Sequence, residues 1–162
     1  MKRNCLISVV IPVGPGHEKL YINAVDSLVA QTFQKWELIL VNDSGNKLPW
    51  IPAFAKYIET SGAQGVAHAR NLGIAASSAP LFIPLDADDI LEPTAISDLL
   101  NEWKRSGGYV YCDWREITGK IHETDEYNCK AILDHMTHAV TALYPKEAWT
   151  KVSGYDETLM GW

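Results

Sequence analysis

The chain has 162 residues, of which 47% are hydrophobic and 21% charged, and its formal net charge is −6 at pH 7. This composition suits one globular domain with a buried core, so we expect a single domain over residues 1–162. A general nucleic-acid binder needs a positive surface, and the absence of any basic run disfavours that class. No stretch approaches the ~20 apolar residues of a membrane span. We expect a cytoplasmic protein, free or peripheral to the inner face of the membrane.

The cysteines are odd in number and show no C-x-x-C spacing, which favours reduced thiols over a disulfide framework. Potential zinc ligands also lie close together in the sequence, but their spacing fits no zinc template. We therefore predict no zinc site at His122, Cys129, His135 and His138.

Apolar, β-branched runs alternate with amphipathic segments along the chain. The runs predict strands over residues 6–11, 36–41, 57–60, 81–85 and 109–113. The amphipathic segments predict helices over residues 18–31, 65–76 and 93–105. A further strand over 117–121 and a short helix over 145–150 follow in a less regular C-terminal third. This alternation predicts an α/β fold, a mostly parallel twisted sheet with flanking helices.

Polar residues follow the ends of separate predicted strands. The first strand runs into Pro12, the second into Asp43, and the fourth into Asp86 and Asp88. Ligands of open α/β sheets bind outside the carboxyl ends of the strands, so we expect these residues to face one crevice.

Asp86 and Asp88 form a D-x-D pair directly after a strand. Hard cations such as Mg²⁺ or Mn²⁺ take carboxylate, phosphate and water oxygens, so the pair predicts a metal site completed by a diphosphate. The alternative is that an aspartate here caps the following helix.

Two further residues have competing interpretations. Asp43 either contacts a nucleotide or only stabilises its Asn-Asp-Ser-Gly turn. Arg70, at the opening of a predicted helix, either offers its planar guanidinium to the nucleotide or is a solvated surface charge. Gly14-x-Gly16 lacks the third glycine of a dinucleotide fingerprint, and no G-K-[ST] phosphate loop occurs.

Taken together, these segments resemble glycosyltransferase family 2, whose catalytic domain has the GT-A fold, a Rossmann-related nucleotide-diphospho-sugar transferase fold. The matching stretches are V-V-I-P at 9–12, Q-T-F-x-x-W-E-L-I-L-V-N-D-x-G at 31–45, A-R-N at 69–71 within 65–73, I-x-L-D-A-D-D at 83–89 and G-Y-D-E at 154–157.

The resemblance implies an inverting, metal-dependent transfer of sugar from a UDP-linked donor to an acceptor hydroxyl. Pro12 would line the base pocket and Asp43 would hydrogen-bond the base. Arg70 would lie near the base or phosphates, and Asp86 near the ribose or sugar. Asp88 would coordinate Mn²⁺ or Mg²⁺, with Asp86 beside it. The sugar and the acceptor, whether saccharide, lipid or polymer, stay open.

The general base of the family usually follows G-[FY]-D-E in an acidic pair, and this sequence stops at Trp162 before such a pair. We expect the base to lie beyond Trp162, in a C-terminal acceptor portion, with Asp156 and Glu157 as weaker candidates. Two alternatives follow: a non-catalytic domain that binds a nucleotide sugar, and a nucleotidyltransferase that makes nucleotide sugars. The second normally has a glycine-rich loop with a basic residue after the first strand, for which residues 14–19 are a poor match.

Overall fold

The computed structural model describes residues 5–124 and 139–159. Its longer strands are β1 (Ile7–Val13), β2 (Trp36–Asn42), β3 (Lys56–Glu59) and β4 (Leu81–Pro84). Its helices are α1 (Tyr21–Val29), α2 (Val66–Ala76), α3 (Ala95–Ser106) and α5 (Lys146–Lys151). Three two-residue strands complete it: β5 (Trp114–Arg115), β6 (Ile121–His122) and β7 (Tyr144–Pro145).

The main sheet has the strand order β3-β2-β1-β4-β7. The first four strands are mutually parallel, and β7 pairs antiparallel with β4. The predicted mostly parallel α/β fold is therefore confirmed. The short antiparallel edge strand fits the known tolerance of parallel sheets for one such neighbour.

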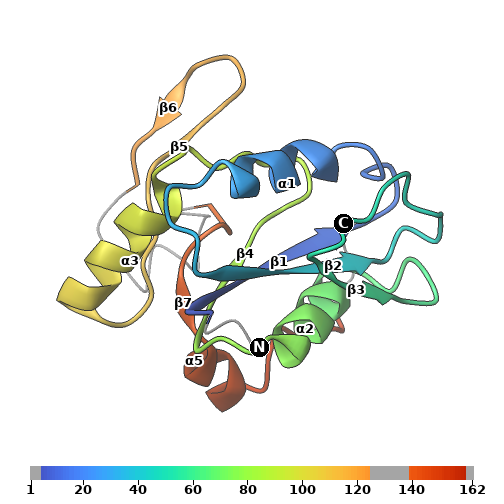
Figure 1. Ribbon diagram of the computed structural model, residues 1–162. Coiled ribbons are helices and arrows are strands. Elements are labelled where there is room, and N and C mark those ends of the chain that lie inside the picture. Colours follow the sequence, from blue (N-terminus) through green and yellow to red (C-terminus); the bar gives the residue numbers. More distant parts are fainter. Residues whose placement is uncertain (1–4, 125–138, 160–162) are drawn as a thin grey trace.

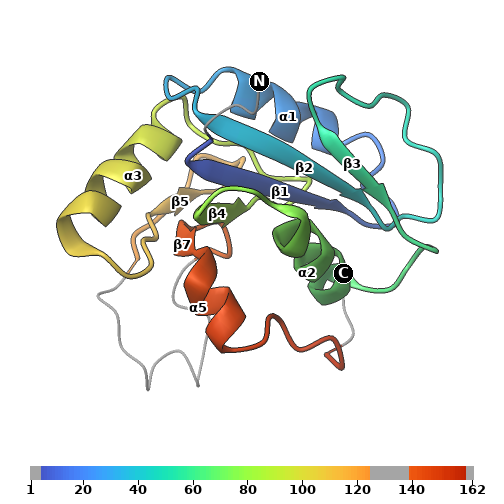
Figure 2. The same cartoon turned by 60° about the horizontal axis from the view of Figure 1, so that its bottom comes forward.

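Helices cover both faces of the sheet (Figures 1 and 2). Alternate β1 residues, Ile7, Val9 and Ile11, pack with the buried face of α1 and with α3. Val10 points to the opposite face and packs with residues of α2, such as Ile74. All of these side chains are fully buried, which explains why β1 reads as a continuous apolar run rather than an alternating one.

Helix α2 packs directly on the sheet at Gly73, which leaves no room for a side chain. A Cβ at this position would stand 2.3 Å from Val10 Cγ1 and 3.1 Å from Val41 Cγ2. A hydrogen in place of a side chain thus lets the helix backbone rest on β1 and β2, and this fixes the distance of Arg70 and Asn71 from the strand ends.

Two expectations about strands were wrong. Residues 109–113 do not form a fifth parallel strand; only Val110 bridges, antiparallel, to Leu143. Glycines at 107 and 108, both with positive φ, turn the chain after α3, and beyond Val110 it does not continue along the sheet. Residues 117–121 are mainly the turn of a hairpin between β5 and β6, with Gly119 at φ +91°, so the strand lies on either side of the predicted span.

In the parts of the chain that the structure describes, no helix is long and apolar enough to cross a membrane.

Candidate functional site

The ends of β1, β2 and β4 meet at one edge of the sheet, as the sequence predicts. Val13 lies beside Asn42 in the register of β1 and β2. Asp43 N donates to Val13 O at 2.9 Å, and Leu85 N donates to Val10 O at 2.9 Å. These backbone bonds carry the ladder beyond the strand ends, so the loops that follow β2 and β4 leave the sheet on either side of β1. Pro12 is buried within β1.

Asp43 is fully buried at this edge. Its Oδ1 accepts from the hydroxyl of Thr60, and its Oδ2 accepts from Gly65 N at 2.9 Å. The carboxylate therefore ties the loop after β2 to the segment that opens α2, which agrees with the turn interpretation. A carboxylate has about four acceptor sites, so two bonds still leave capacity for a ligand N–H.

Arg70 is not a solvated helix charge, because only 9% of the residue is exposed. Its Nη2 lies 2.5 Å from Asp86 Oδ1, and its guanidinium carbon lies 5.7 Å from the centre of the Tyr155 ring. One predicted site residue thus holds another. Arg70 is kept in place by an ion pair and an aromatic face, a combination to which a planar guanidinium is well suited.

The loop after β4 concentrates negative charge. Asp86, Asp88 and Asp89 follow one another around a turn in which Asp89 N donates to Asp86 O at 3.0 Å. Burial, and then the neighbouring Asp86 and Asp88, raise the pKa of the Asp89 carboxyl. Helix α3 begins only at Ala95, and its N-cap is Thr94. The alternative that Asp88 or Asp89 caps this helix is therefore wrong.

Asp88 is more open than Asp86, with 57% against 32% of its side chain exposed, and His17 Nε2 lies 4.0 Å from Asp88 Oδ2. The His17 ring is oriented by a 3.2 Å contact between Nδ1 and Pro15 O. Among the described residues, no cluster of His, Cys, Asp and Glu could hold a metal by itself. Carboxylate oxygens here nonetheless fit a hard cation that takes its remaining ligands from phosphate and water.

Asn71 contacts the 154–157 turn, and this contact was not predicted from the sequence. Asn71 Nδ2 donates to Tyr155 O and to Glu157 Oε1, at 2.9 and 2.8 Å. The A-R-N and G-Y-D-E motifs were both visible in the sequence, but no local pattern indicated that they touch across 84 positions. Tyr155 reaches Arg70 from this turn.

Glu157 also receives a 2.8 Å contact from His68 Nδ1. The hydrogen bond from Asn71, followed by that with His68, lowers the pKa of Glu157. Hydrogen bonds with Thr158 likewise lower the pKa of Asp156. A carboxylate whose pKa is lowered is a weaker proton acceptor, so both environments favour a structural role for these weaker base candidates.

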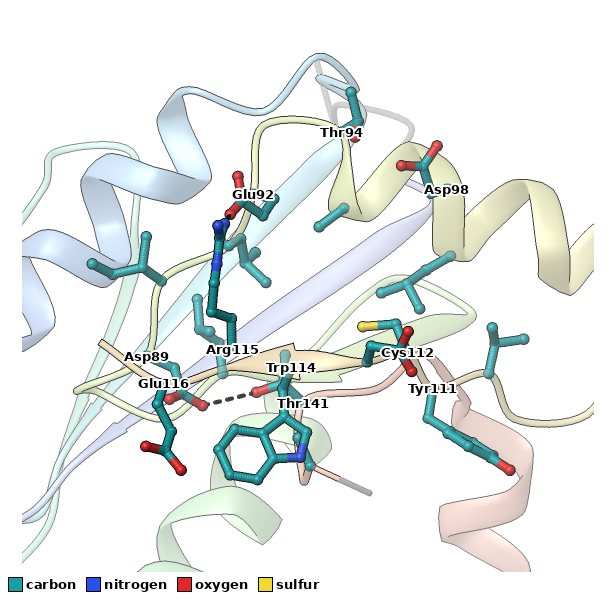
Figure 3. Close-up of a pocket in the computed structure, with 18 of the residues that line it drawn as sticks. Asp89, Glu92, Thr94, Asp98, Tyr111, Cys112, Trp114, Arg115, Glu116 and Thr141 are labelled. Carbon is teal, nitrogen blue, oxygen red and sulfur yellow. Dashed lines mark hydrogen bonds and ion pairs between the residues drawn. The ribbon is translucent and has the colours of Figure 1, made fainter. Parts of the chain in front are cut away.

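A pocket of about 900 Å³ lies beside the acidic loop. Figure 3 shows it between that loop, α3 and the β5–β6 hairpin. Asp89 accepts from Thr141 at 3.3 Å on one wall, and Arg115 pairs with Glu92 on another. Trp114 stands at the rim and stacks on His122 with the ring centres 3.9 Å apart. The lining of the pocket includes Asp88 and Asp89, which also belong to the acidic loop at the strand ends.

His122 pairs with Glu116 at 2.6 Å, while the other zinc candidates, Cys129, His135 and His138, lie outside the described residues.

A parallel sheet with its polar loops gathered at the carboxyl edge, and an acidic loop following β4, defines a GT-A-type nucleotide-sugar transferase fold. The model of the glycosyl transferase family 2 matches residues 8–148, and the chain belongs to this family.

Individual proteins that are similar to this chain are also glycosyltransferases or share its fold. An uncharacterised glycosyltransferase of Rickettsia typhi is 29% identical over 98% of this chain and 57% of its own length. The poly(ribitol-phosphate) beta-N-acetylglucosaminyltransferase TarP of Staphylococcus aureus is 29% identical over 70% of this chain and 38% of its own. The crystal structure of S. aureus TarS 1-349 in complex with UDP superposes with a TM-score of 0.74 at 16% identity, covering 96% of this chain and 52% of that one. The chain thus spans little more than half the length of these relatives where the match is longest.

Proposed function

We propose that this chain is the donor-binding part of an inverting glycosyltransferase that uses a UDP-linked sugar and a divalent cation. The observation that carries the proposal is the Arg70–Asp86 pair beside an open Asp88, at the edge where β1, β2 and β4 end. Family membership makes glycosyl transfer the expected chemistry. TarS structures with UDP and with UDP-GlcNAc share the fold, which supports a uridine nucleotide.

The proposed roles follow the geometry of the edge. Pro12 lines the base pocket, and Asp43 accepts an N–H of the base with its remaining lone pairs. Arg70 holds Asp86 toward the ribose and sugar. Asp88, which is more exposed than Asp86, has its oxygens available for Mn²⁺ or Mg²⁺ together with the diphosphate. When bound, the cation supplies Lewis-acid stabilisation of the departing nucleoside diphosphate.

The transfer step needs one further carboxylate. The acceptor oxygen attacks the anomeric carbon, the bond from that carbon to the phosphate oxygen breaks, and the acceptor proton passes to a base. Hydrogen bonds lower the pKa values of Asp156 and Glu157, which makes each a weaker proton acceptor, so we propose that the base is another carboxylate. The pocket of Figure 3 opens beside Asp88 and Asp89, where an acceptor would approach.

A product assay separates this function from its alternatives. The chain, and the same protein continued past Trp162 through the next acidic pair, would be incubated with UDP-sugars and Mn²⁺. Release of UDP supports the transferase. Pyrophosphate formed from UTP and a sugar phosphate would support a nucleotidyltransferase, and UDP-sugar binding with no turnover by either protein would support a non-catalytic domain.

A further inference from the structure

The amide side chain of Asn71 on α2 binds both α5 and the turn that follows it. Its Nδ2 donates to Tyr155 O and Glu157 Oε1. Its Oδ1 accepts from Tyr155 N at 2.8 Å and from Trp149 Nε1 at 3.0 Å. A primary amide offers two donors and two acceptor lone pairs, so Asn71 uses all four. We call this set of bonds the Asn71 clamp.

Gly154 shows that the two segments must approach closely. Its φ is +86°, and a Cβ there would lie 2.7 Å from Asn71 Oδ1 and 3.1 Å from Trp149 Nε1. A side chain at this position would therefore be strained by its backbone conformation and would push the turn off the amide. The glycine of the G-Y-D-E motif is explained by contact with Asn71.

The clamp leads directly to the strand-end site. Tyr155, whose backbone Asn71 holds at both N and O, places its ring 5.7 Å from the Arg70 guanidinium. The Tyr155 side chain is partly buried and packs against the cluster that includes Val10 and Ile74, and this burial raises the pKa of Tyr155. Arg70 in turn holds Asp86 at 2.5 Å. A continuous series of contacts thus runs from Asn71 through Tyr155 and Arg70 to Asp86.

We propose that Asn71 is a positioning residue for the donor site: it holds Tyr155 against Arg70, so that Arg70 keeps Asp86 in the orientation that receives the donor. This inference rests on the proposed function. Asn71 itself touches no nucleotide in this account. Removing the clamp leaves every ligand-contacting side chain in the sequence but frees the Arg70–Asp86 pair to take other arrangements.

The test compares Asn71→Ala with Glu37→Ala, a control at the opposite end of the sheet whose side chain also makes four hydrogen bonds. Glu37 Oε1 accepts from Ser8 Oγ, Ser78 N, Ser78 Oγ and Ala79 N, near the amino ends of β1, β2 and β4. Calorimetry with UDP and Mn²⁺ should show that Asn71→Ala weakens binding about fivefold or more, the lower range of couplings between linked sites. Glu37→Ala should lower the melting temperature yet change the UDP affinity less than about twofold, as an uncoupled site should.

A second variant and a second readout keep the inference testable if Asn71→Ala folds poorly. Gly154→Ala opens the clamp from the other side and should also weaken UDP binding. Without any ligand, the melting-temperature losses of Asn71→Ala and Asp86→Asn should be non-additive, whereas those of Glu37→Ala and Asp86→Asn should add.

The outcomes distinguish the two claims. Suppose that the wild type binds UDP, and that Asn71→Ala, Gly154→Ala and Glu37→Ala all bind it with the same affinity as the wild type. That result would overturn the positioning role of Asn71 and leave the proposed function intact. Failure of the wild type itself to bind UDP with Mn²⁺ would overturn the proposed function and the donor role together. Additive melting-temperature losses for Asn71 and Asp86 would contradict the contact route in either case.

Discussion

Arg70 on α2 and Asp86 after β4 form an ion pair of 2.5 Å at the edge where the parallel strands end. Arg70 is almost wholly buried, whereas about a third of the Asp86 side chain is exposed. The pair therefore joins the interior under α2 to the surface that would receive a ligand. Asp88, two residues further on, points into more open space with His17 nearby.

Removing the arginine should test how much this pair stabilises the fold. Truncating one partner of a fully buried pair costs about 3–5 kcal/mol, and we expect about 1–3 kcal/mol for Arg70→Met because solvent reaches Asp86. Arg70→Lys should cost less, since it keeps the charge but loses the planar face toward Tyr155. Urea unfolding measures both. A loss for Arg70→Met within the range of surface pairs, below about 1 kcal/mol, would contradict a structural role.

Asp43 should have both of the roles that its sequence context left open. Thr60→Val removes one hydrogen bond to its carboxylate and should lower thermal stability with little change in UDP affinity. Asp43→Asn also removes the charge, and a charge-assisted bond contributes about 1.5–3 kcal/mol, so UDP should bind roughly tenfold more weakly. If the two variants lose stability alike and bind UDP alike, Asp43 is only a turn residue.

Asp89 should make stability depend on pH. Its pKa is raised by burial and by the neighbouring carboxylates, so the folded protein holds this proton at pH values where the unfolded chain has released it. Stability from this group is therefore lost as pH rises from the unfolded value, about 3.9, through the raised folded value. Asp89→Asn should raise the melting temperature relative to wild type more at pH 7 than at pH 4. If the melting-temperature difference between Asp89→Asn and the wild type is the same at both pH values, then ionisation of Asp89 does not destabilise the folded protein.

Gly73 should tolerate no side chain. Gly73→Ala places a Cβ against Val10 and Val41, and overpacking a core costs about 1–3 kcal/mol. Ala75→Ser, on the exposed side of the same helix, is the matched control and should be nearly neutral. Chemical denaturation of both variants measures the difference; similar stabilities would mean that α2 can move away from the sheet at little cost.

The sequence predicted those parts of the fold in which the pattern within a single strand or helix identifies that element. Buried strands such as residues 6–11 showed continuous apolar runs, and the polar residues that follow them came together as parallel topology requires. Residues 109–113 were also predicted as a strand, but only Val110 makes a β-bridge, to Leu143, and no local pattern reveals that. The contact of Asn71 with Tyr155 was equally hidden, because it depends on α5 packing beside α2, a tertiary arrangement that neither motif encodes locally.

The central claim is that the strand-end aspartates bind a nucleoside diphosphate through a divalent cation. Isothermal titration of UDP into the wild-type chain and into Asp88→Asn, each with Mn²⁺ and with EDTA, tests it most directly. We predict that Mn²⁺ strengthens UDP binding to the wild type by at least about tenfold, or 1.4 kcal/mol. Asp88→Asn should lose most of that gain while keeping its circular dichroism spectrum. UDP affinity that is the same with and without Mn²⁺ in both proteins would contradict the assignment of Asp86 and Asp88 to a metal–diphosphate site.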